Sequence, residues 1–493
     1  MCFCWKFASA RHCLVIATLI HCRCRTKRIT ELALTNLTSL LSADFSGNEF
    51  EEINDDRGLD SAITDHSAVF RPVALNYSVF LKTVNLAHNK IKDPIQSKAF
   101  KSFKFLRVFN LSHNNLNKVG SAFSKLMALH TLDLSHNFIS YVEDDALESN
   151  VVLKELYLSH NTLKSIKHKV WRHLFELKVL DLSSNKISTV EHESFASLIA
   201  VRELYLQNNS IYRLQQKLFA CNSLLTQLDL SSNVIATIAP NSFVELHQLT
   251  SLLLNSNRLS SVEPYTFAGL VRLNILVLSD NRIRNISPQA FCELTSLKYL
   301  KLKNNNLQEL SPSVFDAMHF IHSISLNGNF LTQVQTRWFL VPALRIESRK
   351  IVEEYPGMSI PFSVLTALSY KNSVDHFADY DLSDNPWDCS CQTRDFLTWF
   401  HFQKTIRVRN FRSLRCHDPL YHRGYILTEL SPEQLSCWPI SLFQMQILAV
   451  VIFLVALCSR AFWSRQTFMR GRKTHVLWLK NDGYTLTFVD EST

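Results

Sequence analysis

The sequence predicts a solenoid of α/β type, in which short coils stack and each adds one strand to a parallel sheet. Three observations predict this fold. An asparagine recurs along the chain, at first with gaps of 25 and 23 residues and then with a constant gap of 24. Two apolar residues, mostly leucines, alternate with a variable residue before each asparagine, as in LDLSHNFI. From the second asparagine onward, a bulky apolar residue lies 14 positions earlier. Such a period is typical of stacked repeats, since one coil cannot bury its own apolar face. The recurring asparagines are Asn89, Asn114, Asn137, Asn161, Asn185, Asn209, Asn233, Asn257, Asn281, Asn305 and Asn329.

The N-terminal region has two predicted parts. We expect residues 1–24 to form a signal peptide, because Lys6 and Arg11 precede a short apolar run, with cleavage near residues 20–25. Residues 25–80 are expected to hold degenerate N-terminal repeats or a cap. The segment FSGNEFEEI around Asn48 looks like an early repeat, and an acidic stretch interrupts the period after it.

Residues 81–340 carry the regular coils. The alternation around each leucine pair is that of a short strand with one buried face. Leu132 and Leu134 are therefore predicted to point into the core, as are their equivalents in other coils. Each asparagine amide is expected to donate to one backbone carbonyl and to accept from a neighbouring N–H. A column of asparagines would then satisfy the buried turn groups.

The bulky apolar column permits two interpretations. It could form an aromatic ligand groove, or it could form a stacked core spine on the convex side of the solenoid. We favour the core spine, because a repeating large apolar residue is normally buried. Its members are Phe100, Phe123, Leu147, Trp171, Phe195, Phe219, Phe243, Phe267, Phe291 and Phe315.

The full unit, LxxLxLxxNxΦxxΦxxxxFxxLxx with Φ apolar, resembles the 24-residue class of leucine-rich repeat in Toll-like receptor ectodomains and many cell-surface proteins. The resemblance covers about residues 75–340. It implies a leucine-rich-repeat horseshoe with a parallel concave sheet. Residues 341–384 break the pattern, with Arg349 where asparagine is expected, and are predicted to form an irregular repeat or loop.

Residues 385–438 resemble a cysteine-rich C-terminal cap of leucine-rich repeats, opening with NPWDCSCQTRDFLTWF. This resemblance implies the disulfides Cys389–Cys416 and Cys391–Cys437, although four cysteines alone allow three pairings. A zinc site is the rival interpretation. It is disfavoured because the C-x-C spacing differs from that of zinc ligands and because an exported chain favours disulfides.

Of the eight cysteines outside the cap, four bear on the fold of the repeats. Cys22 and Cys24 resemble the start of an N-terminal cap, but the usual partner cysteines do not follow. Cys221 and Cys292 lie nearly three repeats apart, too far along the stack to bridge within one molecule. We expect these two to be buried free thiols near the convex side.

Residues 440–458 form a run of nineteen residues without a charge, ISLFQMQILAVVIFLVALC, long enough as a helix to span most of a bilayer. Basic residues follow it, so the positive-inside rule places the tail, residues 459–493, in the cytoplasm. The expectation is a single-pass, type I protein of the plasma membrane with its repeats outside. A Toll-like receptor would carry a much longer TIR signalling domain in place of this tail, by resemblance. Five sequons agree with export, at Asn36, Asn76, Asn110, Asn208 and Asn285.

The outward residues between the paired leucines are the predicted binding surface. Tyrosine and mixed polar residues on a rigid platform suit protein recognition, whereas the alternative is a merely solvated face. The candidate residues on this concave face are Asp133, Tyr157, Asp181, Tyr205, Asp229, Leu253 and Lys301.

Two further rows follow the repeat. One consists of histidines that directly precede successive asparagines, and it could sense acidic pH or bind a metal; we favour an ordinary form of the repeat, LSHN. The other is basic, seven residues before the asparagines, and could meet acidic glycans or nucleic acid; we favour a solvated edge. The rows are His88, His113, His136 and His160, and Lys82, Arg107, Lys154, Lys178, Arg202 and Lys298.

The function predicted from these features is recognition rather than catalysis. No catalytic motif is present, so we expect no enzyme activity, no cofactor and no metal. The net charge of +9 does not indicate a nucleic-acid partner. The first hypothesis is a receptor or adhesion molecule for an extracellular protein or glycoconjugate, similar to the short-tailed Capricious and Tartan type of adhesion proteins. The alternatives are an innate-immune co-receptor or decoy, and a regulatory or carrier subunit for a partner enzyme. A homo- or hetero-dimer is compatible with each.

Overall fold

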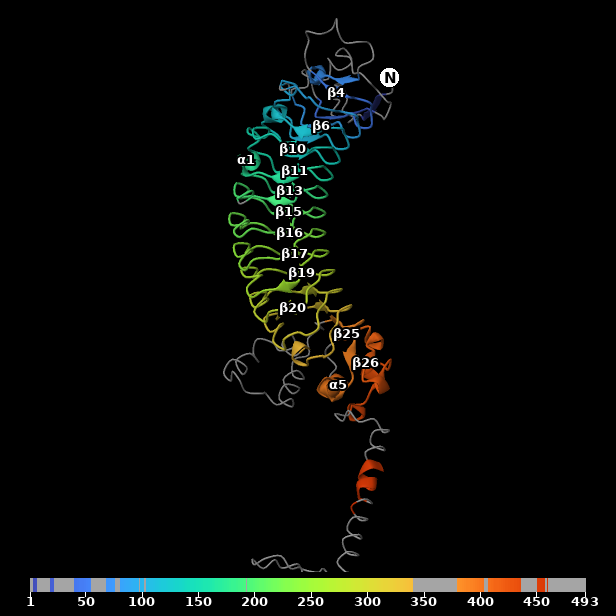
Figure 1. Ribbon diagram of the computed structural model, residues 1–493. Coiled ribbons are helices and arrows are strands. Elements are labelled where there is room, and N and C mark those ends of the chain that lie inside the picture. The colour runs from blue at the N-terminus through green and yellow to red at the C-terminus, as the bar shows by residue number, and fades with distance from the viewer. Residues whose placement is uncertain are drawn as a thin grey trace, which may run out of the picture. The chain divides into compact units, whose positions relative to one another are not determined.

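The computed structural model describes most of the repeat region and the cap. The described residues are 3–6, 18–21, 40–54, 68–75, 80–96, 98–101, 103–191, 193–339, 379–402, 407–435, 450–456 and 459. The chain divides into two compact units, Met1–Gln434 and Leu435–Thr493. In the first unit, coils stack one upon the next as a β-solenoid, and each regular coil adds a strand to the same sheet (Figure 1).

The main sheet has sixteen strands among the described residues. From β2 onward its strands pair in parallel, and Leu156 pairs with Leu132 on one side and Leu180 on the other. The predicted parallel sheet of stacked repeats is thereby confirmed. The strands are, in spatial order, β1 (Phe3–Lys6), β2 (Thr18–His21), β3 (Ser42–Asp44), β6 (Thr83–Asn85), β7 (Val108–Asn110), β9 (Thr131–Asp133), β11 (Glu155–Tyr157), β13 (Val179–Asp181), β15 (Glu203–Tyr205), β16 (Gln227–Asp229), β17 (Ser251–Leu253), β19 (Ile275–Val277), β21 (Tyr299–Lys301), β22 (Ser323–Ser325), β23 (Asp379–Asp381) and β25 (Arg407–Arg409).

Smaller elements form the rest of each coil. Strands of two or three residues form further pairs outside the main sheet, and the helical turns are short. The paired strands are β4 (Glu52–Ile53) with β5 (Val69–Phe70), β8 (Lys118–Val119) with β10 (Tyr141–Val142), β12 (Ser165–Ile166) with β14 (Thr189–Val190), β18 (Ser261–Val262) with β20 (Asn285–Ile286), and β24 (Trp387–Asp388) with β26 (Cys416–Asp418). Two α-helices of the first unit are α1 (His168–Trp171) and α5 (Arg394–Phe402).

The asparagine ladder forms as predicted. The Asn185 Nδ2 donates to the carbonyl oxygens of Leu158 at 2.9 Å and Leu182 at 3.1 Å. Its Oδ1 accepts from the backbone nitrogen of Leu163 at 3.0 Å. The equivalent bonds recur in neighbouring coils, so each asparagine closes its own turn and ties it to the preceding coil.

The bulky column is a core spine, and the ligand-groove interpretation is wrong. Each member is at most 2% exposed. From Phe195 to Phe291 successive rings stack nearly parallel, with centroids 6.0 Å apart for Phe195 and Phe219 and 6.2 Å apart for Phe219 and Phe243. The spine therefore fills the interior on the side away from the sheet and leaves the outward strand residues as the accessible surface.

A regular coil returns at the end of the predicted irregular segment. Strand β23 pairs in register with β22, so Tyr380 lies beside Ile324. The Asn385 Nδ2 donates to the Leu326 carbonyl at 3.0 Å, and its Oδ1 accepts from the Leu331 nitrogen at 3.0 Å. The boundary at residue 384 is thus too late, since the motif YDLSDN already completes a coil. The remainder of 341–384, up to residue 378, lies outside the described residues.

The cap closes this coil. Cys389 and Cys416 form a disulfide, the first of the two pairs that the resemblance implied. Cys391 is also disulfide-bonded. Cys437 lies outside the described residues, as do Cys22 and Cys24.

The predicted membrane span is only partly described. Residues 450–456 are helical. Within the described ranges, no helix combines the length and the apolar character needed to cross a bilayer. Most of 440–458 and nearly all of the tail 459–493 lie outside those ranges. The same holds for most of 1–24, in which only β1 and β2 are described.

Candidate recognition surface

The outward file of the main sheet brings the predicted surface residues together. Each residue lies beside its equivalent in the next strand, because the strands pair in register. The central part of this file alternates acids and tyrosines, and the later part is apolar and then basic. The file includes Asp133, Tyr157, Asp181, Tyr205, Asp229, Leu253 and Lys301, with Val277 between the last two.

The aspartates of this file have a local structural role that the sequence interpretation missed. The Oδ1 atoms of Asp133, Asp181 and Asp229 each accept from the backbone N–H two residues further on, at 2.9 Å. Asn85 and Asn110 make the same bond. This Asx turn satisfies a backbone donor where the strand ends. The signal was present in the sequence, since aspartate or asparagine two residues before a serine recurs in these coils.

The tyrosines have no such turn bond and remain available to a partner. The Tyr205 hydroxyl donates to the Glu203 Oε2 at 2.8 Å. Burial, followed by this hydrogen bond, raises the pKa of Tyr205 to about 12. Burial and the neighbouring carboxylates, with Glu155 first, also raise the pKa of Tyr157 above its ordinary value. Both phenols therefore keep their protons at neutral pH and present a half-buried ring with a polar end.

The histidine row is a continuous stack of exposed rings. Neighbouring ring centroids of His88, His113, His136 and His160 are each 4.1 Å apart. All four residues have left-handed backbone with φ of 53–54°. Histidine, asparagine and aspartate tolerate this conformation better than most residues, and glycine, serine, asparagine or aspartate occupies the same corner elsewhere. The backbone thus explains why polar residues recur at this corner.

The geometry of the histidine stack does not suit the coordination of a metal ion. Parallel rings do not converge on a common point, and the described part of the chain holds no cluster of three or more histidine, cysteine or acidic side chains suited to a metal ion. Burial, followed by the charges of His113 and His160, lowers the pKa of His136. Protonation of His136 is therefore disfavoured near neutral pH.

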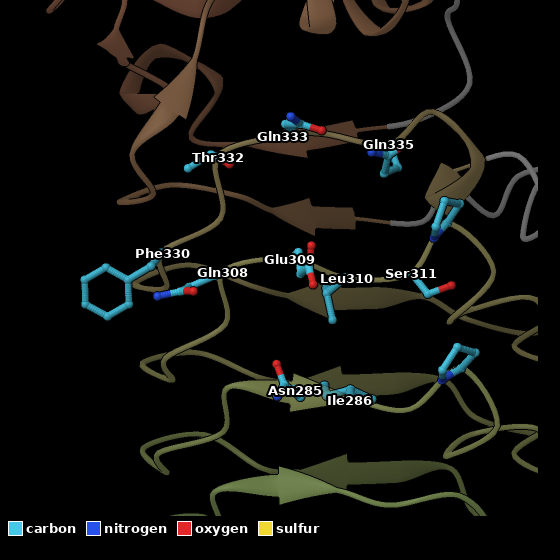
Figure 2. A pocket seen from close by; sticks show the side chains of 12 residues that line it. Asn285, Ile286, Gln308, Glu309, Leu310, Ser311, Phe330, Thr332, Gln333 and Gln335 are labelled. Carbon is cyan, nitrogen blue, oxygen red and sulfur yellow. The ribbon is translucent and has the colours of Figure 1, made fainter.

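A groove of about 920 Å³ lies outside the main sheet, where the pairing of β18 with β20 ends. Figure 2 shows that its side chains come from three successive coils. Its wall is rich in amides, such as Gln308 and Gln333, and Glu309 is its one titratable lining residue. A single carboxylate without a partner acid or base does not make a catalytic site. The groove also includes the sequon residue Asn285.

The sequons differ in their surroundings. Asn208 and Asn285 are exposed. Asn110 lies on the sheet face, where its Oδ1 accepts from the backbone nitrogen of Ser112 at 2.8 Å. Asn36 and Asn76 lie outside the described residues. Glycosylation at all five remains a prediction.

The prediction of buried thiols is wrong. Cys221 and Cys292 are free and exposed. Cys292 directly follows the buried spine residue Phe291, so the turn directs its side chain away from the core. The burial of Phe291 therefore does not extend to the residue that follows it.

Comparisons with known proteins agree with this geometry. The family model described as "Leucine rich repeat" matches residues 80–139, 151–211, 199–259 and 247–307. Fibromodulin from Sus scrofa is 33% identical over 92 residues, which are 19% of this chain and 60% of that sequence. Human lumican is 31% identical over 107 residues, 22% of this chain and 31% of that sequence. The chain thus spans less than two thirds of these relatives.

A solved structure supports the fold at lower identity. The Toll–Spatzle complex from Drosophila contains a chain that is 18% identical, with a TM-score of 0.61, over 85% of this chain and 58% of that one. The protein therefore carries leucine-rich repeats and has the leucine-rich-repeat fold.

Proposed function

We propose that the protein is a cell-surface recognition receptor or adhesion molecule that binds an extracellular protein or glycoconjugate on the outer face of its main sheet. The observation that carries this proposal is the file in which tyrosine alternates with aspartate from Asp133 to Asp229. A tyrosine supplies apolar contact area and a hydrogen bond from one stiff side chain, and tyrosine is enriched at interfaces. The spare oxygen of each aspartate adds an acceptor beside it.

The fold comparisons support a binding role. The solved Toll structure is a complex with Spatzle, so that protein uses the same fold while holding a protein partner. A leucine-rich solenoid offers an extended surface built from equivalent positions of many coils, which suits recognition of a large ligand.

Export and anchoring are part of the proposal. We infer a signal peptide at 1–24, a single span at 440–458 and a cytoplasmic tail at 459–493 from the hydropathy and charge of the sequence. Antibody labelling of an epitope in the repeats on unpermeabilised cells checks this arrangement. Labelling only after permeabilisation would contradict it.

The binding face is tested by cross-linking on intact cells. The parent chain is expected to capture a defined extracellular partner, and the variant Tyr157→Ala with Tyr205→Ala is expected to lose most of that capture. Tyr212→Ala is the matched control, since Tyr212 is exposed but lies outside the outward file of the sheet. Equal capture by the double variant and the control would refute the proposed face.

Three assays separate the competing roles. Cell aggregation in trans on expression indicates adhesion. A changed response to microbial ligands without aggregation indicates an immune co-receptor. One enzyme that co-purifies in stoichiometric amount indicates a carrier subunit.

A further inference from the structure

Exposed apolar side chains form a row beside the sheet over six consecutive coils. In each coil the residue lies nine or ten positions before the ladder asparagine. Scattered exposed apolar residues are ordinary on a protein surface, but a continuous file of them indicates an interaction site. The row and its exposed fractions are Phe80 (60%), Phe105 (62%), Met127 (62%), Val151 (46%), Phe175 (47%) and Ile199 (52%).

A cationic or titratable side chain follows each of these residues by two or three positions. The backbone holds this second row in single file: the nitrogen of Lys178 donates to the carbonyl of Lys154 at 2.7 Å, and that of Arg202 donates to the carbonyl of Lys178 at 2.8 Å. Among the described residues, none of the lysines and arginines of this row forms an ion pair. The row is Lys82, Arg107, His130, Lys154, Lys178 and Arg202.

The basic row ends one coil before the apolar row. In the next coil, Leu224 continues the apolar row, but Thr226 takes the place of the cation. Further on, Val271 is exposed at the equivalent position and Asn274 follows it. Six consecutive coils carry both rows, and this run distinguishes the apolar–basic strip from the general repeat pattern, in which the pairing recurs singly, as at Phe320 and His322.

We propose that the apolar–basic strip binds an acidic amphipathic helix of a partner protein. Equivalent positions in adjacent strands are about 4.8 Å apart. Side chains three or four residues apart on a helix are about 5–6 Å apart, a comparable spacing. Five strand intervals span about 24 Å, the length of a helix of about 16 residues.

The narrowness of the strip favours a helix over a flat membrane. The exposed apolar side chains are confined to one row and the cations to another. This arrangement matches a helix with one apolar stripe and carboxylates along one side of that stripe. The unpaired cations then meet carboxylates, while the apolar stripe covers the exposed side chains. This surface lies beside the outward file of the sheet and adds to the proposed function a second site with its own partner chemistry.

Selection from a displayed library of 16-residue peptides on the purified intact chain tests the proposal. Enriched peptides are expected to carry apolar residues at helical spacing, with aspartate or glutamate beside them. A strip variant, Phe175→Ser with Lys178→Glu, should bind these peptides at least tenfold more weakly. The control, Val271→Ser with Lys298→Glu, replaces an exposed apolar residue and a lysine in a later part of the solenoid and should bind within twofold of the parent.

Two further measurements decide the outcome. Replacing by lysine the one acidic residue of a selected peptide that faces position 178 should restore part of the binding to the strip variant, which loss of folding could not do; thermal melts check that the variant remains folded. Phosphatidylserine-containing vesicles test the membrane alternative. Enriched peptides that bind parent and strip variant equally would overturn the proposal. So would vesicle binding that requires the strip while no acidic helical peptide is selected.

Discussion

The asparagine ladder yields a quantitative prediction for Asn185→Ala. The substitution removes the acceptor of the Leu163 N–H and one donor to each of the Leu158 and Leu182 carbonyls. Those two carbonyls keep other donors, because Asn161 also bonds Leu158 and Asn209 also bonds Leu182, each at 3.0 Å.

The predicted loss therefore comes mainly from one stranded buried N–H. A buried donor left without an acceptor costs about 1–3 kcal/mol. We expect a loss of about 2 kcal/mol, which is about a 30-fold increase in the local opening equilibrium.

Hydrogen exchange read out by mass spectrometry is the suitable assay, because long repeat arrays do not unfold in one cooperative step. Protection should fall at Leu163 and in the two coils that Asn185 joins. Lys186→Ala is the control, since that neighbouring side chain is exposed. Asn185→Asp should be worse than alanine at neutral pH, because a carboxylate would keep the Leu163 bond but face carbonyl oxygens. Unchanged protection in Asn185→Ala, or an aspartate variant as stable as the parent, would refute the reasoning.

The remaining predictions concern the spine and the titratable side chains. Phe243→Ala removes a fully buried ring and should cost about 3–5 kcal/mol locally, whereas Val244→Ala, at an exposed position, should cost far less; exchange protection of the coil measures both. Burial, followed by the neighbouring histidines, lowers the folded pKa of His136 below 6.5. Its contribution to stability is therefore present above pH 6.5 and is lost as pH falls from there to the folded pKa, so thermal melts of His136→Asn should show a weaker loss on acidification. Ultraviolet titration should find the Tyr205 phenol ionising near pH 12, and Glu203→Gln should lower that pKa; no change would argue against the hydrogen bond.

The fold was predictable because its determinants are local and repeated. A buried apolar residue in each strand, mostly leucine, and an asparagine in each turn make equivalent contacts in successive coils, so one period predicts many contacts at once. Prediction failed where the composition of the coil changes. Tyr380 fills a strand position usually taken by leucine, and this substitution hid the last regular coil before the cap.

The surface was less predictable, since outward side chains do not affect packing. Sequence reasoning identified the file of tyrosines and aspartates but missed that Asp181 and its equivalents bond their own backbone. It did not identify the exposed apolar row, because its members shift between two positions of the repeat, from Phe105 to Met127. Exposure depends on how each turn directs its side chains, which the spacing of residues along the chain does not record.

The left-handed corner before each ladder asparagine determines which substitutions such a chain can accept during evolution. Serine, asparagine, aspartate, glycine and histidine all occupy it with φ between 52° and 68°. Because its side chain avoids the core, exchanges among these residues alter what the corner displays without repacking the coil. Substitutions at this corner in successive coils can therefore produce a new column of polar side chains while the packing of the interior stays unchanged. A branched residue such as valine is barred, since it cannot adopt this backbone without strain.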